Sequence, residues 1–190
     1  MIKIATVSGS AQKNNNTENA LALVHDELSK MAEVEVIDIR PKNLKLAIPG
    51  IDMDGSDRSK LQALLKEADG VILATPEYHG SFSSLLKLTI ENMGFPSAIK
   101  GKPVGLLGVA GGSIGAVKSL EHLRSVCAHV GALVLPGSIS IANVRSVFDE
   151  DGNCLDAKAE KSIRKVATRI IRYIEDTSCP KRSFEEMIRD

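Results

Sequence analysis

Short apolar runs rich in β-branched residues alternate along this chain with longer runs of helical periodicity, and this alternation limits the folds open to it. Five runs are predicted strands: residues 2–7, 34–38, 70–75, 103–109 and 132–136. Such alternation is typical of βαβ units, in which a helix connects two parallel strands. Because the strands are almost continuously apolar, we expect a central sheet that is buried on both faces.

The runs between and after these strands predict amphipathic helices. They cover residues 17–31, 57–68, 83–93, 113–130 and 156–174, the last with Ile163, Val166, Ile170, Ile171 and Ile174 as its apolar stripe. The predicted fold is a three-layer α/β sandwich. Five parallel strands in 190 residues match the flavodoxin-like order 2-1-3-4-5, whose ligand site lies where the first and third strands end.

The length of the chain fits one domain, which we assign to residues 1–176. Residues 40–56 and 140–155 are predicted to be long surface loops. Residues 177–190 form a C-terminal tail, in which the run from Ser183 to Glu186 resembles a capping box and predicts a short final helix.

Charge and cysteine usage exclude several classes of protein. The 24 basic and 24 acidic residues cancel without forming blocks, so neither nucleic acid nor a membrane surface is an expected partner. The N-terminal run lacks the features of a signal peptide, and no apolar run reaches membrane-spanning length.

Cys127, Cys154 and Cys179 are odd in number and lack CxxC spacing, which favours a reducing, cytoplasmic location. No His, Cys and carboxylate cluster has zinc-ligand spacing, so we expect no metal.

Small polar side chains fill the stretch from Ser8 to Asn19, after the first predicted strand. Ser10, Thr17 and the free amides of a helix N-terminus could hold a phosphate group there, with Lys13 adding one positive charge. The alternative is a plain turn in which Thr17 caps the helix. The chain contains neither GxxxxGK[ST] nor, after its first strand, GxGxxG, so a mononucleotide is the favoured ligand.

A second unusual loop, Thr75 to Ser81, follows the third predicted strand. It combines a rigid Pro, a carboxylate, one of only two tyrosines, and a Gly that permits close approach of a ligand to the backbone. Its position at the carboxyl end of a parallel strand predicts a binding site. The alternative is an ordinary connection between a strand and a helix.

Six motifs, in order along the chain, resemble the NADPH-dependent FMN reductase family. They are Gly9-Ser10, Thr17-x-Asn19, the run Pro76-Glu77-Tyr78-His79-Gly80-Ser81, Leu85-Leu86-Lys87, the run Gly111-Gly112-Ser113-Ile114-Gly115, and the run Leu120-Glu121-His122-Leu123-Arg124. The resemblance covers roughly residues 2–136. It implies a flavodoxin-like fold, non-covalently bound FMN and a nicotinamide nucleotide as reductant.

The resemblance also implies a role for individual residues. Ser10, Thr17 and Asn19 would hold the FMN phosphate. Around the isoalloxazine ring would lie Pro76, Glu77, Tyr78, His79, Gly80 and Ser81, with Gly111 and Gly112 as the third flavin loop. Gln12 stands where the family usually has Arg, so Lys13 or the helix dipole must supply the compensating charge.

Three further departures from the family pattern bear on substrate preference and on the dimer surface. His79 replaces the usual Asn before the Gly of the second loop. Ser83-Ser84 replaces a common Pro-Gly, and Glu91-Asn92 replaces an Asp-Trp.

The predicted function is an FMN-dependent oxidoreductase that takes hydride from NADPH or NADH and reduces a second small acceptor in a ping-pong cycle. A quinone, an azo compound, a metal oxyanion or free flavin would serve as acceptor. Flavin carries the redox chemistry itself, so no catalytic side chain is required, with His79 as the one candidate. A homodimer or homotetramer is expected. The alternatives are a flavodoxin-like electron carrier, which the zero net charge disfavours, and a flavin-binding regulatory protein without turnover.

Overall fold

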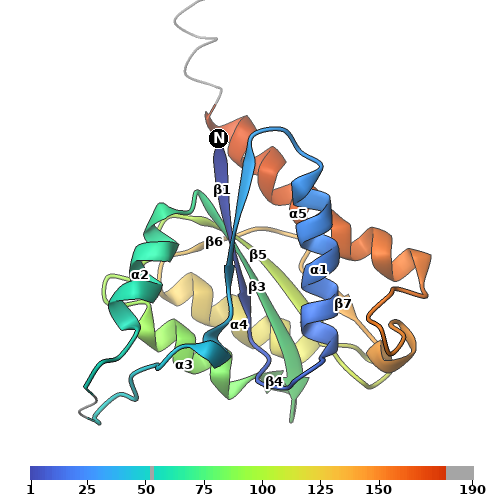
Figure 1. The fold of residues 1–190 in the computed structure, drawn as a ribbon, viewed down its shortest axis with the longest axis horizontal. Coiled ribbons are helices and arrows are strands. Elements are labelled where there is room, and N and C mark those ends of the chain that lie inside the picture. Colours follow the sequence, from blue (N-terminus) through green and yellow to red (C-terminus); the bar gives the residue numbers. More distant parts are fainter. Residues whose placement is uncertain (52–53, 179–190) are drawn as a thin grey trace, which may run out of the picture.

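A computed structural model describes residues 1–51 and 54–178 of the chain. Their fold is the predicted three-layer sandwich (Figure 1), with a central sheet between two layers of helices. The strands are β1 (Ile2–Ser8), β2 (Val34–Ile39), β3 (Gly70–Tyr78), β4 (Ser81–Phe82), β5 (Pro103–Val109), β6 (Leu133–Val134) and β7 (Ile139–Ile141). The main path runs β2-β1-β3-β5-β6 with parallel pairing throughout, which confirms the predicted order 2-1-3-4-5.

Within residues 1–51 and 54–178, five α-helices cover the two faces of the sheet. They are α1 (Asn16–Ser29), α2 (Arg58–Glu67), α3 (Ser84–Asn92), α4 (Val117–His129) and α5 (Ala157–Ser178). In Figure 1, α1 and α5 lie on one side of the sheet, and α2, α3 and α4 lie on the other. Each face has its own apolar core: Ile4 and Ile72 point toward α1 and α5, whereas their neighbours Ala5 and Val71 point the other way. This alternation is the period of two that a strand buried on both faces must show.

The prediction for the fifth strand and the loop after it was partly wrong. The run 132–136 forms only the two-residue β6, because Pro136 offers no N–H for pairing and Gly137, at φ +77°, turns the chain. Pairing with β5 then resumes at β7, whose end lies inside the predicted loop 140–155. The short 3-10 helix η2 (Val144–Ser146) follows, and Phe148 beyond it is buried in the core. The first half of this segment, as far as Phe148, is therefore packed against the core, and the predicted surface loop is confined to the residues after it.

The other helix predictions were confirmed within four residues at each end, and the start of α4 and the end of α5 differ most. The predicted helix began at residue 113, but α4 begins at Val117, because Gly115 has φ +78° and belongs to the preceding loop. The helix α5 continues to Ser178, beyond the predicted domain end at residue 176. The predicted tail helix falls among residues 179–190, which lie outside the described residues. None of the helices described combines the length and the apolar character that crossing a membrane requires.

Candidate functional site

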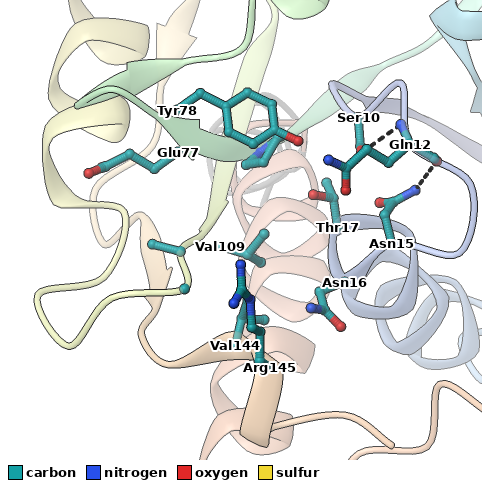
Figure 2. Close-up of a pocket in the computed structure, with 13 residues that line it drawn as sticks. Ser10, Gln12, Asn15, Asn16, Thr17, Glu77, Tyr78, Val109, Val144 and Arg145 are labelled. Atoms are coloured by element: carbon teal, nitrogen blue, oxygen red, sulfur yellow. Dashed lines mark hydrogen bonds between the residues drawn. The ribbon is translucent and has the colours of Figure 1, made fainter. Parts of the chain in front are cut away.

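The segments after β1, β5 and β7 and the end of β3 surround a cleft of about 250 Å³ at the carboxyl end of the sheet (Figure 2). This is where open α/β sheets bind their ligands. The lining residues are Ser10, Gln12, Asn15, Asn16, Thr17, Pro76, Glu77, Tyr78, Val109, Ala110, Gly111, Val144 and Arg145. A second hollow of about 330 Å³ adjoins the cleft and shares Glu77, Ala110 and Gly111 with it.

The first wall of the cleft is the loop between β1 and α1. Asn15, and not Thr17, caps the helix: its side chain accepts a hydrogen bond from the Glu18 amide at 2.9 Å and donates one to the Gln12 carbonyl at 2.8 Å. Thr17 is thereby left in the first turn of α1 as a lining residue of the cleft. The arrangement presents a helix N-terminus, with its unpaired amides, to the cleft, and such an end favours an anion.

The second wall is a tight hairpin formed by β3 and β4, which corrects the predicted loop from Thr75 to Ser81: the strand continues three residues past its predicted end, because Glu77 and Tyr78 pair with β4. Glu77 pairs with Phe82 and Tyr78 with Ser81, which leaves His79 and Gly80 as a two-residue turn. Both turn residues have positive φ, +49° and +72°, as a type I′ turn requires. His is one of the few residues other than Gly that adopt this conformation with some frequency. His79 therefore has a conformational role in the turn, and its side chain is exposed in the adjoining hollow.

Glu77 directs its carboxylate away from Ser10 and Thr17 (Figure 2). Its Oε2 accepts a hydrogen bond from the Ser119 amide in the first turn of α4 at 3.0 Å. A carboxylate at a helix N-terminus interacts favourably with the positive end of the helix dipole and so stabilises the helix. Glu77 thus joins the second wall to α4, and the carboxylate is engaged in structure and not free in the cleft.

The third wall is the glycine loop after β5, which is held in place by the segment after β7. The Ala110 amide donates to the Ile141 carbonyl at 2.9 Å, the Val144 amide to the Ala110 carbonyl at 2.9 Å, and the Asn143 amide to the Gly112 carbonyl at 3.0 Å. Gly111 and Gly112 are exposed, and a Cβ at Gly112 would meet nothing within 4 Å. This loop leaves room for a planar group to lie directly on the backbone.

Three predicted site residues line neither the cleft nor the adjoining hollow. Lys13 is exposed outside it, and Asn19 faces Gly152, where a Cβ would lie 2.9 Å from the Asn19 amide oxygen. Ser81 Oγ lies 3.0 Å from His122 Nδ1 on α4. The other predicted residues come together: Ser10, Gln12, Thr17, Pro76, Glu77, Tyr78 and Gly111 in the cleft, and His79, Gly80 and Gly112 in the adjoining hollow.

Sequence reasoning missed Arg145, which comes from the segment that was predicted to be a surface loop. Within residues 1–51 and 54–178, only Glu77 and Arg145 bring charged side chains to the lining of the cleft. A signal was available: Arg145 is the only basic residue between 140 and 155, and Val144, Val147 and Phe148 around it are apolar at the spacing of a packed segment.

Other reactive groups have ordinary structural roles. Burial raises the pKa of the Cys127 thiol to about 12, so this cysteine is a packed small side chain in α4. The part of the chain that the structure describes holds no group of three or more His, Cys, Asp or Glu side chains suited to a metal ion.

The sheet order and the position of the cleft define a protein of the flavodoxin-like fold. The NADPH-dependent FMN reductase family matches residues 2–146, well over half of the chain. The chain therefore belongs to this family of NAD(P)H-dependent FMN oxidoreductases, which use FMN with a nicotinamide nucleotide as reductant. The match extends ten residues past the predicted limit at 136 and so includes the segment that carries Arg145.

Relatives and solved structures agree with this assignment. The FMN-dependent NADPH-azoreductase of Staphylococcus aureus is 30% identical over 180 residues, which cover 90% of this chain and 94% of the relative. The flavoenzyme FerB, an NAD(P)H:acceptor oxidoreductase from Paracoccus denitrificans, superposes with a TM-score of 0.76 at 21% identity, over 93% of this chain and 98% of FerB. A flavodoxin from the domain Archaea superposes with a TM-score of 0.67 at 14% identity, over 92% and 99% of the two chains. The two structural likenesses establish the fold.

Proposed function

We propose that this chain binds FMN in the cleft, takes hydride from NADPH or NADH and reduces a small second acceptor. The observation that carries the proposal is the convergence of a helix N-terminus, an exposed aromatic side chain and an exposed glycine loop on one cleft at the carboxyl end of the sheet. A helix N-terminus can bind a phosphate group, an aromatic side chain can pack against a planar ring, and a glycine loop lets that ring approach the backbone closely.

The phosphate is proposed to lie against the first wall. Ser10 and Thr17 supply hydroxyl groups, Gln12 supplies an amide, and the N-terminal amides of α1 supply donors and the positive end of the dipole. The exposed Lys13 contributes only at long range, because its side chain lies outside the lining.

The isoalloxazine ring is proposed to lie between the second and third walls. Pro76 and Tyr78 border it on one side, and Gly111 on the other, while the turn at His79 and Gly80 fixes the shape of the edge. Bound FMN supplies the chemistry by accepting hydride and passing electrons on. The protein orients the ring and leaves the adjoining hollow, lined by residues 112–115, for the nicotinamide and then for the acceptor.

The acceptor is proposed to be an azo compound, because the Staphylococcus aureus relative is named an azoreductase and aligns along almost its whole length. A quinone is the alternative acceptor that the resemblance to the family implies. A flavodoxin-like electron carrier is the second candidate, supported by the fold shared with the archaeal flavodoxin. The zero net charge counts against it, since carriers that dock on basic partners are strongly acidic.

We further propose that the chain forms a homodimer or homotetramer in a reducing, cytoplasmic compartment. The exposed apolar side chains Ile114 and Val117, 83% and 45% exposed beside the adjoining hollow, would be covered in an oligomer. Cys127 and Cys154 are both free thiols. Light scattering that reports a monomer would contradict the oligomer.

The function is tested with purified protein that has been loaded with FMN. Steady oxidation of NADPH or NADH in the presence of an azo dye or a quinone supports an enzyme, and a parallel reaction with free FMN in place of the protein measures the background. Protein that binds FMN and shows no oxidation above this background would favour the carrier or a regulatory protein.

A further inference from the structure

We propose that Arg145 is a flavin-binding residue that faces the N1–C2=O edge of the bound ring and stabilises the reduced cofactor. The inference rests on the proposed binding of FMN in the cleft. It concerns a side chain outside the six motifs, in a segment whose structure the sequence did not predict.

The backbone that carries Arg145 is held firmly against the third wall. Val144, the residue before it, is 5% exposed and donates its amide to the Ala110 carbonyl at 2.9 Å. Asn143 adopts a left-handed conformation at φ +47°, and the Ser146 amide and hydroxyl both bond the Asn143 carbonyl at 2.9 Å. The turn thus fixes where the arginine side chain leaves the backbone, and Figure 2 shows the guanidinium group in the cleft.

The charge of Arg145 has no acidic partner among the side chains that the structure describes. Arg40, near the first wall, differs in this respect: it pairs with Glu18 at 2.9 Å and with Asp38 at 2.8 Å. The other charged lining residue, Glu77, is engaged with the Ser119 amide. Arg145 is therefore the cation that is available to a negatively charged ligand group in the cleft.

The position of Arg145 points to the ring and not to the phosphate. A Cβ at Gly111, in the proposed third flavin loop, would lie 3.7 Å from Arg145 Nε. The proposed phosphate site at Ser10 and Thr17 belongs to a different wall of the cleft (Figure 2). When flavin accepts hydride, negative charge develops at its N1 and C2=O edge, and a fixed cation beside that edge stabilises the charge. Arg145 should therefore bind reduced FMN more tightly than oxidised FMN.

The test compares the midpoint potentials of FMN-loaded wild-type, R145Q and R145K proteins, measured by spectroelectrochemistry, with R172Q as the matched control. Arg172 lies on α5, where its side chain is 83% exposed. R172Q makes the same change of arginine to glutamine as R145Q, but outside the cleft. R145Q should weaken the binding of reduced relative to oxidised FMN about tenfold, which lowers a two-electron potential by about 30 mV. R145K should keep most of the wild-type potential, and R172Q all of it.

A second measurement shows whether Arg145 interacts with the ring of the cofactor or with its phosphate. The dissociation constants of FMN and of riboflavin, which lacks the phosphate, are measured for wild-type and R145Q proteins. An R145Q potential equal to that of the wild type would overturn the proposal, as would a loss of affinity for FMN with none for riboflavin. Wild-type protein that binds no flavin would instead refute the proposed function itself, which makes the two failures distinguishable.

Discussion

Ser83 joins the first two walls of the cleft to the helix that follows them, so replacing it with alanine should destabilise the protein measurably. Its side chain is 3% exposed, and its hydroxyl donates to the Gly9 carbonyl at 2.5 Å while accepting from the Leu86 amide at 3.1 Å. Its own amide donates to Thr75 Oγ1 at 3.1 Å. One hydroxyl therefore caps α3 and binds the loop after β1.

The size of the effect follows from these two side-chain contacts. Loss of an N-cap hydroxyl costs about 1 kcal/mol. A buried carbonyl that loses its donor costs about 1–3 kcal/mol more, and Gly9 is buried. S83A should therefore lower the free energy of unfolding by about 2–4 kcal/mol, which corresponds to roughly 5–15 °C in melting temperature for a chain of this size.

Urea unfolding of flavin-free protein, followed by circular dichroism, measures this difference. The neighbouring S84A is the matched control, because Ser84 is the exposed first residue of α3 and its hydroxyl takes no part in the cap; it should stay within about 0.5 kcal/mol of wild type. If S83A also stayed within about 0.5 kcal/mol, the coupling of the cap to Gly9 would be refuted.

Three further predictions concern the fold and the walls of the cleft. Burial, followed by Arg40, lowers the pKa of His25 below its usual 6.5, against the opposing effect of Asp38. The unfolded chain then binds the proton more readily, so the free energy of unfolding should fall as the pH drops below about 6.5. H25Q should flatten this dependence between pH 7.5 and 5.5, and an equal slope in both proteins would contradict the assignment. E77A leaves the Ser119 amide without its acceptor and should cost about 1–3 kcal/mol in a urea titration, whereas a variant as stable as wild type would show that the contact contributes nothing. T17A should weaken the binding of FMN about tenfold and that of riboflavin little, as measured by fluorescence quenching; an equal loss for both ligands would place the phosphate elsewhere.

The sequence predicted the sheet order because each strand carries its own signal. Residues 70–74 and 103–109 are almost uninterrupted apolar runs, so the type of both strands and the position of their apolar parts could be predicted. The extension of β3 to Tyr78 could not, because it depends on pairing with β4. The loops after β1 and β3 were predicted as site walls for a related reason, since the carboxyl ends of neighbouring parallel strands meet at one edge of the sheet.

The predictions from sequence were wrong where contacts between distant residues, and not the local pattern of apolar residues, determine the structure. β7 is three residues long, and its pairing with β5 depends on a turn at Gly137 that no periodicity reveals. Arg145 enters the cleft only because Val144 is bonded to Ala110, a contact between residues far apart in the sequence. Asn19 failed to reach the cleft for a geometric reason: it lies one turn into α1, where its side chain faces Gly152.

The most direct test of the central claim is anaerobic titration of the FMN-loaded protein with NADPH and, separately, with NADH, followed by the absorbance of the bound flavin. The account predicts that at least one nucleotide bleaches the flavin stoichiometrically and that an azo dye or a quinone then restores its absorbance. Bound flavin that neither nucleotide bleaches would contradict the account.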